Sequence, residues 1–227
     1  MSSLLNQIAD SARRSRDAQG AILTTEFLGT CRELLPIIDK FGSGFSLVRS
    51  DIGGNIDRLA AAQAKDPTRY TTLFTVVTDE VKRGEQQGKQ SVTNGLLWLK
   101  RATEFILLLL KRLHDHRDVA LSTAASEVYY QTLNKYHTWY TAAAFTVVLK
   151  FVPSRETFFA ALGSPGEQMM LDLQTLFDSF EPLLLDVQKF LAEHNLDFQN
   201  PHGVQNVADY IPDAVPRITS APQQAVQ

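Results

Sequence analysis

Apolar side chains recur every three or four residues along most of the chain, the spacing of amphipathic helices. No stretch alternates apolar and polar residues with a period of two, and no internal repeat is visible. The pattern therefore predicts an all-α fold, a bundle or layered helical sandwich of about eight helices. The helical segments are residues 21–40, 45–64, 67–84, 91–114, 119–150 (one or two helices), 154–162 and 166–194.

Three features interrupt or weaken this pattern. Pro36 is expected to bend or fray the first helix, and Pro182 to kink the last. Valines and threonines, poor helix formers, are frequent in 67–84, so a strand is the competing prediction there.

The segment 91–114 is the most hydrophobic. Apolar residues surround most of its circumference, which predicts a central, buried helix. Its densest run, FILLLL at 105–110, is far shorter than the roughly 20 residues that a membrane span needs.

Residues 1–20 contain no continuous apolar core of the signal-peptide kind. Their arginines and serines resemble a transit peptide, but Asp10 and Asp17 argue against one. We set this stretch apart as an N-terminal extension of the domain.

The helical pattern decays after His194. Four prolines follow, so residues 196–227 are interpreted as a tail that is partly docked through Phe198, Tyr210 and Ile211. The domain itself is expected to span 21–195.

Composition narrows the class further. The 227 residues are 44% hydrophobic and 21% charged, typical of a globular domain, and the net charge of −3 does not favour a nucleic-acid partner. The single cysteine, Cys31, excludes an intramolecular disulfide and fits a reducing compartment. We therefore expect a cytoplasmic monomer.

Polar residues of the segment 45–59 share one helix face. Asp51, Asn55 and Arg58 fall at i, i+4 and i+7, which sets an acceptor, an amide and a guanidinium in one stripe. This comb, as we call these three residues, could bind a group rich in hydroxyls and amides; a solvated face with an internal ion pair is the alternative. The adjacent Gly53-Gly54 suggests that something approaches the backbone closely there, because two glycines in a helix cost about 1 kcal/mol each relative to alanine.

The sequence gives little support for a catalytic or metal site. His114 and His116 lack the partners and spacing of a zinc site, and no nucleophile, phosphate or dinucleotide motif is present. Asp51 and His137 could form a base and its orienter, but a lone histidine in an apolar helix is more often a core residue. We expect no enzyme activity, metal or cofactor.

Two tryptophans have both a core and a binding interpretation. Trp98 could fill the core or stack its indole on the apolar face of a sugar. Trp139 lies two residues after His137, hence on a different helical face, and could fill the core or meet a membrane–water interface.

Three separated motifs stand out, DIGGN-x2-R at 51–58, LLWLKR at 96–101 and KYHTW at 135–139, with the flanks FGSGF at 41–45 and FVPSRETFFAAL at 151–162. In order and spacing, over about 22–195, they resemble the signatures of the glycolipid transfer protein family. The resemblance implies a two-layer all-α sandwich that holds a sphingolipid headgroup at its surface and the hydrocarbon chains in an apolar cavity. Such proteins move lipid between membranes without ATP or catalysis.

The resemblance assigns a headgroup role to five residues. Asp51 and Asn55 would bond hydroxyls of the first sugar, and Arg58 stands where the family usually has lysine. Trp98 would be the stacking platform for that sugar, and His137 would bond the ceramide amide carbonyl, with Asp51 taking the amide N–H.

It also implies an acyl-chain tunnel and a transient contact with a membrane surface. Trp139 matches the family residue that inserts at the membrane, and Lys150 lies near it. Residues that would line or neighbour the tunnel are Phe45, Val48, Phe105, Leu109, Leu133, Phe145 and Leu149.

The ligand class has alternatives. The guanidinium of Arg58 is planar and suited to binding phosphate, so a phosphorylated sphingolipid such as ceramide-1-phosphate is the alternative ligand. The retained Trp98, with Ala102 one turn on, favours a sugar over a phosphate. An unrelated all-α hydrolase or scaffold would require the three motifs to match by chance.

Overall fold

A computed structural model describes residues 3–88 and 90–198. No strand is present in these ranges, only two isolated bridges, so the all-α prediction is confirmed. The helices are α1 (Leu4–Arg14), α2 (Thr24–Glu33), α3 (Leu35–Asp39), α4 (Ser46–Gln63), α5 (Leu73–Lys82), α6 (Val92–Asp115), α7 (Leu121–Gln131), α8 (Trp139–Val148), α9 (Arg155–Leu162) and α10 (Glu167–Glu193). Single 3-10 turns are η1 (Ser43–Phe45), η2 (Asn134–Tyr136) and η3 (Leu149–Phe151).

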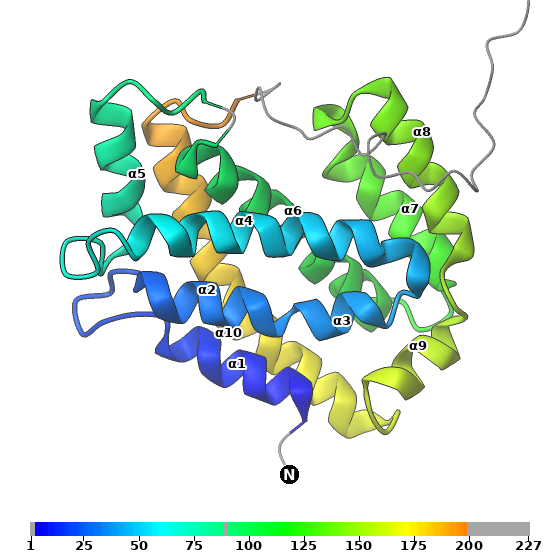
Figure 1. Cartoon of the computed structure of the whole chain (residues 1–227). Helices are drawn as coiled ribbons and strands as arrows, with labels where there is room; N and C mark the ends of the chain where they lie inside the picture. The colour runs from blue at the N-terminus through cyan, green and yellow to red at the C-terminus, as the bar shows by residue number, and fades with distance from the viewer. Residues whose placement is uncertain (1–2, 89, 199–227) are drawn as a thin grey trace, which may run out of the picture.

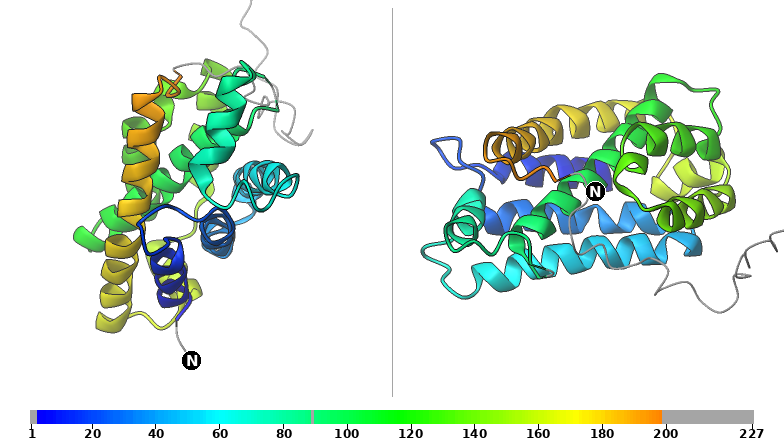
Figure 2. Two further views of the ribbon diagram at one scale, coloured as in Figure 1. Left: turned by 90° about the vertical axis from the view of Figure 1, so that its left-hand side faces the viewer. Right: turned by 90° about the horizontal axis from the view of Figure 1, so that it is seen from above.

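The helices form two layers, as the sequence predicted. In Figure 1, α2 and α3 follow one another in a row, α4 runs alongside them in front, and α6 and α10 cross behind. The left view of Figure 2 shows α2 and α4 nearly end-on to one side of α10. Amphipathic helices bury their apolar stripes between such layers, which leaves the two outer surfaces polar.

Helix α6 is the central helix of the core, because nearly every turn of it is buried. Its N-terminus is fixed by Glu80, which is only 5% exposed. That carboxylate accepts hydrogen bonds from the backbone N–H groups of Val92 and Thr93, each at 2.7 Å. A negative charge at this end of a helix complements the exposed N–H groups and the helix dipole.

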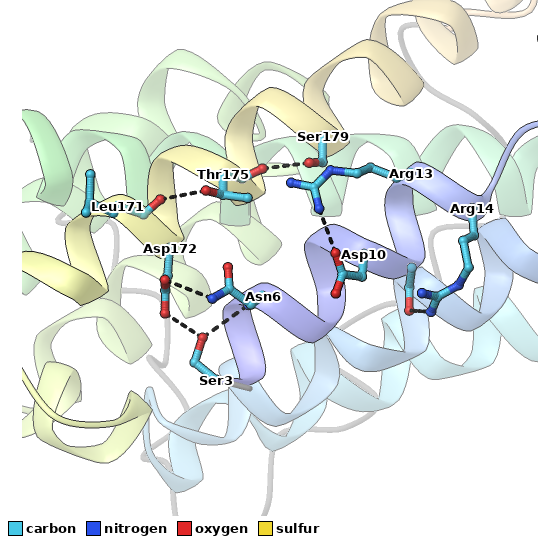
Figure 3. Close-up of polar contacts among 10 residues, drawn as sticks. Ser3, Asn6, Asp10, Arg13, Arg14, Leu171, Asp172, Thr175 and Ser179 are labelled. Atoms are coloured by element: carbon cyan, nitrogen blue, oxygen red, sulfur yellow. Dashed lines mark hydrogen bonds and ion pairs between the residues drawn. The ribbon is translucent and has the colours of Figure 1, made fainter. Parts of the chain in front are cut away.

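The N-terminal stretch is part of the packed body. Helix α1 lies along α10, and its residue Ile8 is completely buried. Asp172 of α10 accepts hydrogen bonds from the Ser3 hydroxyl at 2.6 Å and the Asn6 amide at 2.9 Å (Figure 3). The boundary that the sequence suggested after residue 20 therefore does not separate this helix from the core, although it does precede α2.

Several predicted helix limits differ from the structure. The segment 21–40 is two helices that meet at Leu34, since Pro36 occupies the first turn of α3. The segment 119–150 is broken between α7 and α8, where residues 132–138 leave the helical path. In 67–84 the helix begins only at Leu73, and the competing strand prediction is wrong.

The start of the C-terminal tail contacts the core. Phe198 packs against the hydrophobic cluster, as predicted. Arg101 of α6 donates from Nη2 to Asp197 Oδ1 at 2.7 Å and to the Phe198 carbonyl at 2.6 Å. The other residues expected to dock the tail, Tyr210 and Ile211, lie outside the described ranges.

Candidate functional site

A pocket of about 100 Å³ opens where α4, α6 and α8 meet. All five residues assigned to a headgroup from the sequence line this pocket, namely Asp51, Asn55, Arg58, Trp98 and His137. They come from three elements that are far apart in the chain. The structure thus brings the predicted headgroup residues together, while their ligand remains a prediction.

The comb on α4 is linked internally by hydrogen bonds. Arg58 Nη1 donates to Asn55 Oδ1 at 3.2 Å, and Asn55 Nδ2 donates to Asp51 Oδ2 at 3.4 Å. Asn55 is 5% exposed and Asp51 lies in contact with solvent at the pocket mouth. Desolvation by the surrounding protein nevertheless raises the pKa of Asp51, and the charge of Arg58 counteracts this.

Close approach between helices occurs at Gly95 and not at the glycine pair in α4. A Cβ atom built on Gly53 or Gly54 would meet no described protein atom within 4 Å, so no neighbouring helix requires that pair. A Cβ atom on Gly95 of α6 would lie 3.2 Å from Arg58 Cδ and 3.7 Å from the Asn55 carbonyl oxygen. Gly95 therefore allows α6 to approach the comb.

Trp98 and His137 form the opposite wall of the pocket. Their rings stack with centroids 5.7 Å apart and an interplanar angle of 23°. The indole is only 8% exposed, and its Nε1 has no hydrogen-bond partner among the described residues. Burial, reinforced by the positive charge of Arg101, lowers the pKa of His137 to about 4, so this imidazole is neutral at pH 7.

His137 does not lie in a helix. It follows η2 in extended backbone, and α8 begins two residues later at Trp139. Our prediction that the two side chains diverge holds, because His137 lines the pocket and Trp139 is 70% exposed. The reason we gave, a rotation about one continuous helix, is wrong; the chain changes conformation between them.

The apolar floor of the pocket contains three of the residues that we predicted to line a tunnel. Val48, Leu133 and Phe145 line it. Phe45 and Phe105 lie behind them and meet the Phe145 ring edge-on, with centroids 6.1 Å and 5.8 Å away. These five residues therefore form a continuous apolar path from the pocket into the core.

Leu109 and Leu149 are buried in the same core but do not line the pocket. A volume of about 100 Å³ corresponds to roughly three water molecules at about 30 Å³ each. It is too small for a long hydrocarbon chain. A tunnel at this place would require the helices to move apart.

Two contributors to the site were missed in the sequence. Tyr129 of α7 is completely buried, and its hydroxyl lies 3.1 Å from His137 Nδ1. Arg101 places its guanidinium carbon 3.4 Å from the Tyr136 ring centroid and 5.2 Å from that of Trp98. Arg101 belongs to the LLWLKR motif and could have been noticed there, whereas no spacing in the sequence distinguishes Tyr129.

The residues predicted to dock on membranes lie on the surface beside the pocket. Lys150 in η3 is exposed, like Trp139. Within the described residues, no helix is long and apolar enough to cross a membrane, and no group of histidine, cysteine and acidic side chains is arranged to hold a metal ion.

Relatives of known sequence match most of the chain. The family model of the glycolipid transfer protein (GLTP) matches residues 22–164. Glycolipid transfer protein 1 of Arabidopsis thaliana is 38% identical over 188 residues, which are 83% of this chain and 93% of the relative.

Solved structures share the fold. FAPP2, described as selecting simple glycosphingolipids with the GLTP fold, superposes with a TM-score of 0.80 at 26% identity, covering 88% of this chain and 99% of that one. The mouse ceramide-1-phosphate transfer protein gives 0.79 at 26% identity, covering 86% and 98%. With the motifs of α4, α6 and the η2–α8 connection gathered around one pocket, the chain belongs to the glycolipid transfer protein family.

Proposed function

We propose that this protein is a non-enzymatic carrier of glycolipids, most of all glycosphingolipids, between membranes. One observation carries the proposal: the comb, Trp98 and His137 surround a single pocket whose floor is apolar. A ligand with hydroxyls and an amide at one end and hydrocarbon at the other matches that order of side chains. The names of the relatives, glycolipid transfer proteins among them, support the same ligand class.

Each wall of the pocket would recognise a different part of the headgroup. Asp51 and Asn55 supply an acceptor and an amide for sugar hydroxyls, and Arg58 adds a donor. The indole face of Trp98 would pack on the apolar face of the first sugar ring. The amide of the lipid backbone would then lie beside His137, with Asp51 available for its N–H.

A sugar suits the pocket better than a phosphate. Among the described lining residues Arg58 is the one cation, and Asn55 links it by hydrogen bonds to the carboxylate of Asp51 on the same helix. Ala102 offers no charge one turn after Trp98. A phosphate monoester, which carries close to two negative charges at pH 7, would leave much of its charge uncompensated. The ceramide-1-phosphate transfer protein among the structural relatives keeps that lipid as the second candidate.

Hydrocarbon chains would enter between the layers near Phe145. Burying each CH₂ group contributes about 0.8 kcal/mol, so a chain of many carbons can offset the cost of separating packed helices. Helices can slide apart without breaking their internal hydrogen bonds. The protein would work as a monomer on the cytoplasmic side of membranes, in keeping with its single, buried Cys31.

Native mass spectrometry of the delipidated protein, mixed with equal amounts of glucosylceramide, ceramide-1-phosphate and a diacylglycerol glycolipid, tests the ligand class. The expected adduct is glucosylceramide, in a one-to-one complex. A dominant adduct of ceramide-1-phosphate would favour the second candidate, and no lipid adduct at all would contradict a carrier.

A further inference from the structure

Tyr129 is the one residue in direct polar contact with the inner nitrogen of His137 among the described residues. Its side chain is completely buried, and its ring stacks on Phe145 with centroids 4.5 Å apart and an interplanar angle of 16°. Its hydroxyl oxygen lies 3.1 Å from Nδ1 of His137. The stacking fixes the phenol, so packing of the two rings sets the position of the hydroxyl.

The direction of this hydrogen bond follows from what each partner has available. Within the described residues the Tyr129 hydroxyl has no second hydrogen-bond partner. If Nδ1 carried the hydrogen and donated it, the buried O–H would be left without an acceptor, which costs about 1–3 kcal/mol. If the hydroxyl donates, Nδ1 accepts, and the neutral imidazole must carry its hydrogen on Nε2.

We propose that Tyr129 is a positioning residue that holds His137 in the Nε2–H tautomer, so that the pocket presents an N–H donor to the carbonyl oxygen of a bound lipid amide. His137 lines the pocket, and its Nε2 has no partner among the described residues. The opposite tautomer would turn a nitrogen lone pair toward that oxygen, and two acceptors repel. This inference rests on the proposed function for its ligand, but the tautomer belongs to the free protein.

An N–H donor at His137 also favours one class of lipid backbone. The second hydrogen-bonding group at the pocket mouth, Asp51, is an acceptor when ionised. A donor at His137 and an acceptor at Asp51 match the C=O and N–H of an amide, whereas an ester offers only the C=O. A site built for two hydrogen bonds rejects a ligand that makes one, because a polar group is left unpaired.

Nuclear magnetic resonance of the ¹⁵N-histidine-labelled full chain, without lipid, tests the tautomer. The chain has five histidines, and His137→Gln identifies the signals of interest by their loss. In the wild type we expect an unprotonated Nδ1 and a protonated Nε2 at pH 7. Tyr129→Phe should shift the pair toward a mixture of tautomers. Tyr70→Phe is the matched control, since it removes the same hydroxyl from a ring that lines a separate pocket with Ala62 and Val76 and not the pocket of His137.

Transfer of glucosylceramide between phosphatidylcholine vesicles supplies the second readout. Tyr129→Phe should slow transfer about tenfold, the effect of losing one well-oriented hydrogen bond, and Tyr70→Phe should not. A protonated Nδ1 in the wild type, or a Tyr129→Phe protein with an unchanged His137 spectrum, would overturn the proposal. If Tyr129→Phe does not fold, the wild-type spectrum decides alone. A wild type with the expected tautomer but no lipid transfer would instead refute the proposed function.

Discussion

His137 is the residue at which the core and the pocket of this protein meet. Its imidazole stacks on Trp98, lies with Nδ1 3.1 Å from the Tyr129 hydroxyl, and lines the pocket. Each neighbour removes water from the ring, and the charge of Arg101 adds to the cost of protonation. The environment therefore keeps His137 neutral, a state in which a single N–H can be presented to a ligand.

Stability should fall in acid because of this histidine. Its pKa is near 6.5 in the unfolded chain and about 4 in the folded protein. Between these values the unfolded state binds a proton that the folded state does not, so unfolding becomes easier as the pH drops from 6.5 to 4. The loss attributable to His137 is about 3 kcal/mol at most. Urea titrations at pH 7 and pH 4.5 should show a smaller difference for His137→Gln than for wild type; an equal difference would assign the acid sensitivity elsewhere.

At the residue scale the sequence predicted which side chains meet but not how they are held. The helical spacing of Asp51, Asn55 and Arg58 was enough to place them on one face of α4. Helical spacing was misleading for His137, because residues 132–138 leave the helical path. Tyr129 is close to His137 because residues 132–138 turn the chain back after α7. The spacing of apolar residues cannot predict such a contact.

The contact between α4 and α6 is the element-scale feature that forms the site. α4 supplies the comb and α6 supplies Trp98, and the two helices approach at Gly95. Gly54, on the solvent side of α4, has no such role. The two glycines thus provide a matched pair for testing helix approach.

Gly95→Ala should impair lipid transfer while the protein stays folded. The new methyl group would lie 3.2 Å from Arg58 Cδ, so the arginine must shift out of the comb. The gain of about 1 kcal/mol in helix propensity roughly offsets a packing cost of about 1–3 kcal/mol. Gly54→Ala should raise the free energy of unfolding by about 0.5–1 kcal/mol and leave transfer unchanged. Urea unfolding and vesicle transfer measure both; equal transfer by the two variants would show that close approach at Gly95 does not matter.

The sequence predicted the existence of the helices better than their ends. α6 was recognised almost to the residue, since its apolar run is a local signal. The break between α7 and α8 was not, because no proline or glycine marks residues 132–138. α1 was set apart, although its docking depends on Asp172 of α10, 166 residues away from Asn6. The spacing of apolar residues along the chain cannot predict such long-range partners.

On the scale of the whole molecule, exposed apolar side chains are concentrated at one end. Five of the seven large ones among the described residues belong to α7, α8 or η3, beside the pocket mouth. The five are Tyr130, Trp139, Tyr140, Val147 and Phe151, and the remaining two, Leu171 and Leu185, lie on α10. Aromatic rings are favoured at a membrane interface, so this end is our proposed docking surface.

Trp139→Ala should weaken adsorption to vesicles and slow transfer in proportion, while binding of detergent-dispersed glycolipid stays near the wild-type value. The indole is 70% exposed, so its removal should cost little stability. Leu185→Ala, a 63% exposed residue on α10, is the control and should change neither quantity. Vesicle sedimentation measures adsorption. Normal adsorption of the Trp139→Ala protein would place the docking surface elsewhere.

The rate of lipid transfer between vesicles, compared for glucosylceramide and ceramide-1-phosphate, tests the central claim most directly. One cation, a carboxylate and an indole in the pocket wall predict faster transfer of the sugar lipid. We expect a difference of about tenfold, which corresponds to about 1.4 kcal/mol in favour of the sugar. Equal rates, or faster transfer of ceramide-1-phosphate, would contradict the assignment of the pocket to a sugar and make Arg58 a phosphate ligand.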